Sequence, residues 1–174
     1  MTLSNIKLFF TDIDGVWTDG GMYYSENGVE LKKFNTLDAA GVLLLRNLNI
    51  EIAIISGERT DSVKKRAHKL GIDNCFLGVK NKLATAKSFI DSKNISFEEC
   101  AHIGDDYNDI ELLKKVGLSA CPSNARTDIK NIVEWSLKIN GGDGAFCAFV
   151  EKYLTDILKI EPITIYKNIY GFNI

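Results

Sequence analysis

Short apolar runs alternate along this chain with segments of helical periodicity, and that alternation is the strongest constraint on its fold. The apolar runs lie at 6–11, 50–55, 75–77, 100–103, 116–121 and 132–136. The helical patterns lie at 37–47, 60–70, 81–92, 108–115 and 124–129, with a last helix expected after residue 144. Strands that alternate with helices imply right-handed crossovers and a parallel sheet covered on both faces. The sequence therefore predicts a three-layer, doubly wound α/β fold.

Residues 20–34 depart from this alternation. Two β-type stretches flank Glu26-Asn27-Gly28, and Asn-Gly in such a setting is a strong hairpin signal. The 174 residues show no repeat or linker, so we expect one domain over 1–174. Its C-terminal part, 141–174, contains a glycine-rich segment and then an apolar, aromatic tail. We expect the tail from residue 155 to pack on its own domain or on a neighbouring subunit.

Composition excludes several classes of partner. The formal net charge is only −2, which argues against a nucleic-acid surface or a polybasic membrane patch. The four cysteines are widely spaced and form no metal-type pattern with the two histidines, which favours free thiols in a reducing cytosol. We see no signal-peptide pattern at the N-terminus and no apolar run near the ~20 residues that span a bilayer. We expect a soluble, cytoplasmic protein.

Acidic residues follow two of the predicted strands. Asp12 and Asp14 end the first run in the motif Asp-Ile-Asp-Gly, and Asp105, Asp106 and Asp109 follow the run at 100–103. In open parallel sheets the site lies beyond the carboxyl ends of the strands, so both clusters should reach one cleft. Mg²⁺ prefers oxygen ligands and keeps several waters, so a few carboxylates and a substrate phosphate suffice to hold it. Helix capping is the alternative role for the second cluster, and it can coexist with metal binding.

Two further elements suit an anion site. Ser56-Gly57 closes the strand at 50–55, where a hydroxyl and exposed backbone N–H groups precede a helix. Lys82 opens the helix at 81–92 and can neutralise a phosphate. Each feature alone is common in turns and on surfaces. Their order along the chain, each in a βα loop, predicts phosphoryl chemistry.

These four elements resemble the four motifs of the haloacid dehalogenase superfamily of phosphatases, over nearly the whole chain. The resemblance implies that Asp12 attacks phosphorus to form an aspartyl-phosphate, and that Asp14 protonates the leaving group and later activates water. It implies Mg²⁺ held by Asp12, by the backbone carbonyl of Asp14 and by Asp105. Asp106 and Asp109 would support these ligands from outside. Ser56, Gly57 and Lys82 would bind the phosphoryl oxygens.

Only about 40 residues separate Asp14 from Ser56, which leaves no room for a cap domain. A capless chain with Asp-Gly-Val-Trp-Thr-Asp-Gly-Gly-Met-Tyr-Tyr is similar to the tetrameric phosphatases of 3-deoxy-2-keto sugar acids. That resemblance implies a homotetramer centred on the hairpins and a glycine-rich segment that reaches a neighbour's active site. Gly141-Gly142-Asp143-Gly144-Ala145 matches this segment, but Cys147 and Ala148 stand where the family usually has arginine and glutamate.

The resemblance also implies a set of substrate contacts, namely Asn35, Asp38, Glu58, Arg66 and Lys69. Glu58 with Lys69 favours a nine-carbon, sialic-acid-like 9-phosphate, and Arg66 is a candidate clamp for the substrate carboxylate. The alternative is 3-deoxy-D-manno-octulosonate 8-phosphate, and a basic solvated helix face is the alternative role for Arg66 and Lys69.

Two alternative functions, from other classes of protein, stay open. A phospho-accepting receiver domain is also doubly wound, but it would place adjacent acids after the first strand and the acceptor after the third. Here the adjacent pair, Asp105 and Asp106, comes late. A catalytically silent oligomerisation module is the other alternative, although no expected polar residue is missing.

Overall fold

The computed structural model describes residues 3–171, and a six-stranded parallel sheet forms its centre. The strand order is β5-β4-β1-β6-β7-β8. The strands are β1 (Leu8–Thr11), β4 (Glu51–Ser56), β5 (Asn74–Leu77), β6 (Cys100–Ile103), β7 (Leu118–Cys121) and β8 (Trp135–Ser136). β1 lies between β4 and β6, so the carboxyl ends of these three strands meet at one edge of the sheet.

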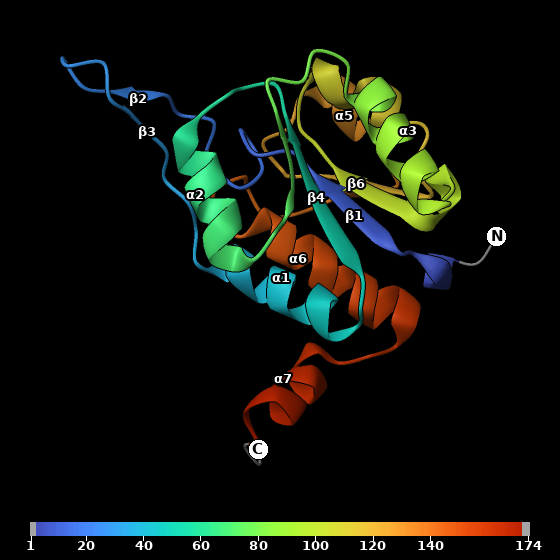
Figure 1. Cartoon of the computed structure of the whole chain (residues 1–174). Helices are drawn as coiled ribbons and strands as arrows, with labels where there is room; N and C mark the ends of the chain where they lie inside the picture. Colours follow the sequence, from blue (N-terminus) through green and yellow to red (C-terminus); the bar gives the residue numbers. More distant parts are fainter. Residues whose placement is uncertain (1–2, 172–174) are drawn as a thin grey trace.

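Helices cover both faces of this sheet (Figure 1). They are α1 (Leu37–Asn47), α2 (Asp61–Leu70), α3 (Lys82–Lys93), α4 (Ile110–Leu113), α5 (Thr127–Lys130), α6 (Ala145–Lys152) and α7 (Pro162–Tyr170). Shorter turns are η1 (Leu3–Asn5), η2 (Phe97–Glu99), η3 (Tyr107–Asp109) and the π-helical η4 (Tyr153–Leu158). The buried side chains of α1, α2 and α6 join one core cluster, and those of α3 and α4 join another. The three-layer α/β prediction is confirmed.

Strand β1 shows why a buried strand of this sheet is apolar at successive positions. Successive side chains of a strand point to opposite faces. Phe9 faces α6, where the centroids of its ring and the Phe149 ring lie 5.2 Å apart. Leu8 and Phe10 face the other way and join the cluster on the α3 side. All three are fully buried. A strand covered on both faces needs apolar residues at every position.

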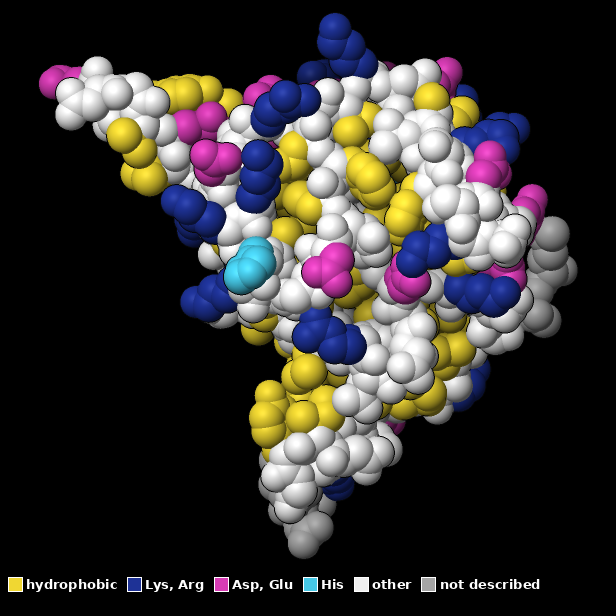
Figure 2. Space-filling model, in the orientation of Figure 1, with side chains coloured by type: hydrophobic (Ala, Val, Ile, Leu, Met, Phe, Trp, Pro, Cys, Tyr) yellow, Lys and Arg dark blue, Asp and Glu magenta, His cyan; other side chains and the backbone are white. Residues whose placement is uncertain are grey.

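The predicted hairpin forms and projects from the body of the molecule (Figure 1). Strands β2 (Tyr23–Tyr24) and β3 (Glu30–Leu31) pair antiparallel. Large apolar side chains on it are exposed, among them Tyr24 at 63% and Leu31 at 59%. Figure 2 shows the projecting arm with hydrophobic side chains on its surface. The described chain has no cap domain, as expected, so the hairpin is the only large projection between β1 and β4.

The tail packs on its own domain as far as the structure describes it. Ile165 of α7 is 5% exposed and belongs to the core cluster of α1 and α6. Tyr166 and Ile169 pack against the same cluster and are partly buried. Residues 172–174 of the expected tail lie outside the described residues. Among residues 3–171, every helix is too short or too polar to cross a membrane.

Candidate active site

A small open cleft lies beyond the carboxyl ends of β1, β4 and β6. Its volume is about 260 Å³, enough for a phosphoryl group and the adjoining part of a small metabolite. Its lining residues are Asp12, Asp14, Gly15, Gly20, Ser56, Gly57, Glu58, Asp105, Asp106 and Asn108. The chain leaves β1 toward β4 on one side and returns to β6 on the other, and ligands in doubly wound sheets bind where the strand order reverses in this way.

The loop after β1 turns tightly to bring two acids together. The backbone N–H groups of Val16, Trp17 and Thr18 all donate to the carbonyl of Ile13. Gly15 has φ +84°, and a Cβ there would lie 2.0 Å from a carboxylate oxygen of Asp105. Glycine at position 15 is therefore required for Asp105, which follows β6, to approach the loop that follows β1.

Trp17 holds this loop against the core. Its indole N–H donates to Thr11 Oγ1 at 2.8 Å, and its ring stacks on Phe146 with centroids 5.0 Å apart. The side chain is fully buried. Trp17 therefore packs the loop in place instead of forming an aromatic wall of the cleft.

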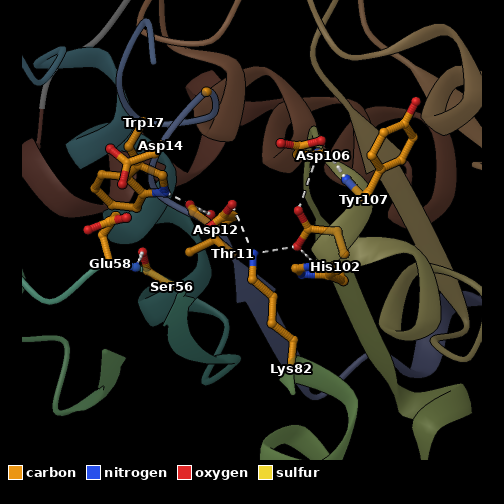
Figure 3. Close-up of polar contacts among 12 residues, drawn as sticks. Thr11, Asp12, Asp14, Trp17, Ser56, Glu58, Lys82, His102, Asp106 and Tyr107 are labelled. Carbon is orange, nitrogen blue, oxygen red and sulfur yellow. Dashed lines mark hydrogen bonds and ion pairs between the residues drawn. The ribbon is translucent and has the colours of Figure 1, made fainter. Parts of the chain in front are cut away.

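Lys82 lies between two carboxylates at the floor of the site (Figure 3). Its Nζ is 2.9 Å from Asp12 Oδ2 and 2.7 Å from Asp109 Oδ1, and its side chain is 1% exposed. Asn81 caps α3 by accepting the N–H of Ala84, which fixes the start of the helix that carries the lysine. Burial would lower the pKa of Lys82, but the charges of Asp12 and Asp109 outweigh it and raise the pKa. The ammonium group stays charged.

His102 also contacts Asp109, although it belongs to none of the sequence motifs of the predicted site. Its Nε2 lies 2.9 Å from Asp109 Oδ1, and both side chains are fully buried. Burial opposes the charged form of Asp109, but Lys82 and His102 lower its pKa below the ordinary value. The signal was present in the sequence, because His102 shares a strand face with the buried Cys100, two residues earlier.

Three carboxylates gather closely enough to hold a metal ion. Oxygen atoms of Asp12, Asp105 and Asp109 lie within 4.8 Å of one another. Burial, followed by the charge of Asp109, raises the pKa of Asp12 to about 8 and that of Asp105 to about 7. Asp12 Oδ1 and Asp105 Oδ1 are buried without a hydrogen-bond partner. An all-oxygen donor set with unpartnered buried atoms fits Mg²⁺. The charge of the ion would offset the cost of burying charged carboxylates.

The carboxylate group differs from the predicted ligand set at one position. Asp109 belongs to the group, whereas the resemblance placed it outside the direct ligands. The side chain of Asp14 does not belong to it, which agrees with an expected contribution through the backbone carbonyl alone. Asp14 Oδ1 is instead held by Lys32 Nζ at 2.5 Å, a residue that the sequence analysis did not single out. The ligand set stays a prediction.

Two of the expected phosphate-binding residues, Ser56 and Gly57, line the cleft at the end of β4. Ser56 is the last residue of β4, and its Oγ accepts the N–H of Glu58 at 3.3 Å. Gly57 and Glu58 line the cleft beside it, and Asp106 lines the other rim. Asp106 accepts the N–H of Tyr107 and pairs with Arg126, which fixes it at that rim.

Most of the implied substrate residues lie away from the cleft within the described chain. Glu58 is the exception, since it lines the cleft. The Asn35 side chain donates to the carbonyl of Gly142, and Arg66 donates to the Asn35 carbonyl. Asp38 is fully buried and accepts the N–H of Cys147. Lys69 is exposed on α2 and does not line the cleft. The substrate contacts stay predictions.

The glycine-rich segment packs against the loop after β1 of the same chain. Its reach to a neighbour's site, which the resemblance implied, stays a prediction. Gly142 N–H donates to the carbonyl of Val16, and a Cβ on Gly141 would lie 1.8 Å from the carbonyl oxygen of Gly15. Close backbone contact of this kind requires glycine. Cys147 and Ala148, the departures from the family pattern, follow on α6.

Comparisons with known proteins agree with this fold. The model of the haloacid dehalogenase-like hydrolases matches residues 78–148. The chain is 35% identical to the 3-deoxy-D-manno-octulosonate 8-phosphate phosphatase KdsC of Haemophilus influenzae, over 83% of this chain and 80% of that protein. A probable YrbI family phosphatase from Pseudomonas syringae has a TM-score of 0.91 at 33% identity, covering 99% of this chain and 96% of that one.

A further relative was solved with ligands. The 3-deoxy-D-manno-octulosonate 8-phosphate phosphatase of Moraxella catarrhalis, in complex with a magnesium ion, a phosphate ion and KDO, has a TM-score of 0.88 at 30% identity. It covers 98% of this chain and 95% of that one. The expected magnesium cofactor is thus supported both by a ligand-bound relative and by the carboxylate group.

The parallel sheet, the absence of a cap and the acidic cleft define a haloacid dehalogenase-like hydrolase. Within that class, the chain belongs to the KdsC/YrbI family of capless phosphatases. The predicted enzyme class, a phosphoric monoester hydrolase, is confirmed at this level.

Proposed function

We propose that this protein is a Mg²⁺-dependent phosphatase of 3-deoxy-D-manno-octulosonate 8-phosphate that works through an aspartyl-phosphate. The observation that carries the proposal is the gathering of Asp12, Asp105 and Asp109 beyond β1 and β6, with the ammonium group of Lys82 between Asp12 and Asp109. Phosphoryl transfer needs mainly positioning and charge neutralisation, and this group supplies both. Asp12 and Asp105 are the carboxylates whose unpartnered atoms suit Mg²⁺, and the ion would neutralise the phosphoryl oxygens.

Asp12 is the nucleophile in the first step. Lys82 contacts its Oδ2, and its Oδ1 is buried without a protein partner. One of the two oxygens would hold Mg²⁺, and the other attacks phosphorus. As the bond from this oxygen to phosphorus forms, the bond from phosphorus to the sugar oxygen breaks. Asp14, in the same cleft, gives its proton to that oxygen. Ser56 and Gly57 line the same cleft, where a hydroxyl and a backbone N–H would donate to the phosphoryl oxygens.

Water completes the reaction in the second step. Asp14, now a carboxylate, takes a proton from the water as the water attacks phosphorus. The bond between phosphorus and the Asp12 oxygen breaks, which restores the carboxylate and releases phosphate. Lys82 stays protonated throughout, because two buried carboxylates raise its pKa. It therefore supplies fixed positive charge beside the nucleophile.

The eight-carbon substrate is preferred to the nine-carbon acid that the sequence favoured. The preference for a nine-carbon substrate relied on the presence of Glu58 together with Lys69. In this structure Lys69 is exposed on α2 and does not line the cleft. The relatives that cover most of this chain carry the octulosonate name. A cytoplasmic location, which the sequence predicts, fits a small-metabolite phosphatase.

Phosphate release from a panel of phosphate esters tests this proposal. The panel holds octulosonate 8-phosphate, two nonulosonate 9-phosphates and common hexose phosphates, each with Mg²⁺ and with a chelator. We expect Mg²⁺-dependent hydrolysis with kcat/KM for the octulosonate ester at least about 100-fold above that for hexose phosphates. A preference for a nonulosonate ester would reverse the choice of sugar. No hydrolysis of any ester would refute the enzymatic role and favour a signalling or silent module.

The hairpin is the proposed surface for assembly with further copies of this chain. Met22, Tyr23, Tyr24, Val29 and Leu31 are large, apolar and exposed on an arm that stands away from the core. Contiguous exposed apolar surface of this kind marks interaction sites. A homotetramer, as implied by the family resemblance, would bury it.

Leu31→Glu combined with Tyr24→Glu is expected to dissociate the assembly, because four copies would bring these charges together in an apolar centre. Light scattering after size-exclusion chromatography measures the mass. Ile163→Glu, on the exposed face of α7, is the matched control and should leave the mass unchanged. A double variant that keeps the mass of the unmodified protein would exclude the hairpin as the contact.

A further inference from the structure

The hairpin also carries a residue that reaches back into the cleft. We infer that Lys32 is a positioning residue, which holds Asp14 so that one chosen oxygen of this acid faces the leaving group. The inference rests on the proposed function, because it assigns a task to the proton donor of that reaction. Lys32 lies directly after β3, and its side chain is 1% exposed although the backbone around it is at the surface.

The contacts of Asp14 are divided unequally between its two oxygens. Oδ1 accepts from Lys32 Nζ at 2.5 Å and from Thr18 Oγ1 at 3.4 Å. Oδ2 is buried and has no hydrogen-bond partner among residues 3–171. Glu30 Oε1, 3.4 Å from Lys32 Nζ, holds the ammonium group from the other side. Lys32 is therefore held between the carboxylates of Glu30 and Asp14, and it limits the rotation of the Asp14 carboxylate.

This division decides where the catalytic proton is carried. Lys32 has donors only, so the oxygen that accepts from it is not the one that carries a proton toward the substrate. The proton of Asp14 is carried on Oδ2. In the first step the Oδ2–H bond breaks as the proton moves to the sugar oxygen, and the bond from that oxygen to phosphorus breaks at the same time. Without Lys32 the carboxyl group can rotate about its Cβ–Cγ bond, and the proton is no longer aimed at the leaving group.

Leaving-group dependence separates this task from a merely structural role. A sugar alkoxide must be protonated as it leaves, whereas a 4-nitrophenolate leaves without help. The experiment measures single-turnover cleavage of octulosonate 8-phosphate and of 4-nitrophenyl phosphate, by rapid quench with enzyme in excess and saturating Mg²⁺. Single turnovers isolate the first step from the water attack, in which Asp14 also takes part.

Lys32→Met is expected to slow cleavage of the sugar ester by about 10- to 100-fold, a fraction of the roughly 10²–10⁴-fold that general acid catalysis supplies. Cleavage of the nitrophenyl ester should change by less than about 3-fold, because its leaving group needs no such proton. Lys32→Arg, which keeps a charged donor, should recover most of the loss. Lys33→Met is the matched control, since the neighbouring side chain is 65% exposed, and it should leave both rates unchanged.

The outcomes are distinguishable. An equal loss for both esters would overturn the inference, because damage to the fold, to Mg²⁺ binding or to the nucleophile slows both. An unchanged sugar-ester rate in a folded Lys32→Met variant would overturn it as well. In either case the proposed function would stand, since it is tested by the unmodified protein. Failure of the unmodified protein to cleave either ester would overturn both.

Discussion

Asp12→Asn is expected to abolish turnover while the fold stays intact. An amide cannot attack phosphorus to form the acyl phosphate, and loss of a nucleophile in a hydrolase costs up to roughly 10⁶-fold in kcat, so we expect a loss of about 10⁴-fold or more. Burial raises the pKa of Asp12 to about 8, so the fold disfavours the charged form, and a neutral side chain of the same shape is tolerated. Phosphate release measures the turnover, and thermal unfolding measures the fold.

A matched substitution on the same loop controls for this prediction. Asp19 is exposed and hydrogen-bonded to Gly21 N–H and Tyr23 OH outside the cleft, so Asp19→Asn should keep full activity. Acid quench during turnover should trap a phosphorylated chain with the unmodified protein and none with Asp12→Asn. If Asp14→Asn removed the trapped phosphoenzyme and Asp12→Asn retained it, the roles of the two acids would have to be exchanged.

The fold was predictable because burial on both sheet faces leaves a simple signal. Fully buried strands such as β1 and β6 appear as unbroken apolar runs, and β6 at Cys100–Ile103 matches its predicted range. The helix expected at 108–115 is broken instead, with the η3 turn before a short α4. The cause is local, since Asp106 and Asp109 exchange capping hydrogen bonds with the backbone and tighten the first turn.

Most of the predicted residues at the cleft lie directly beyond strand ends, and Lys82 opens the helix that follows β5. Asp12, Ser56 and Asp105 meet at the cleft for that reason. Lys32 and His102 were missed because their roles depend on tertiary contacts, one across the hairpin and the other through the buried face of β6. Of the residues that the resemblance implied for substrate binding, Asp38 and Lys69 lie outside the cleft of this chain, and their role stays a prediction.

Lys82→Met is expected to impair both activity and stability. It leaves Asp12 and Asp109 buried without their shared cation, and breaking a buried ion pair by removing one partner costs about 3–5 kcal/mol. For a chain of this length, each kcal/mol lowers Tm by roughly 2–4 °C. We expect the larger loss of Tm without Mg²⁺, because a bound cation near the same carboxylates restores part of the missing positive charge. Calorimetry with and without Mg²⁺ measures this difference, and Lys80→Met, on the exposed residue before the helix cap, is the control.

A double variant separates the structural part of Lys82 from its catalytic part. Lys82→Met with Asp109→Asn removes the lysine and one of the two charges that it neutralises, so most of the lost Tm should return. Activity should not return, because a phosphate dianion approaching Asp12 would still meet no fixed positive charge from the protein. Recovery of activity together with Tm would mean that Lys82 serves the fold alone and that neutralisation at the phosphoryl group comes from elsewhere. A Tm that stays low would place its cause outside the Asp12–Lys82–Asp109 contacts.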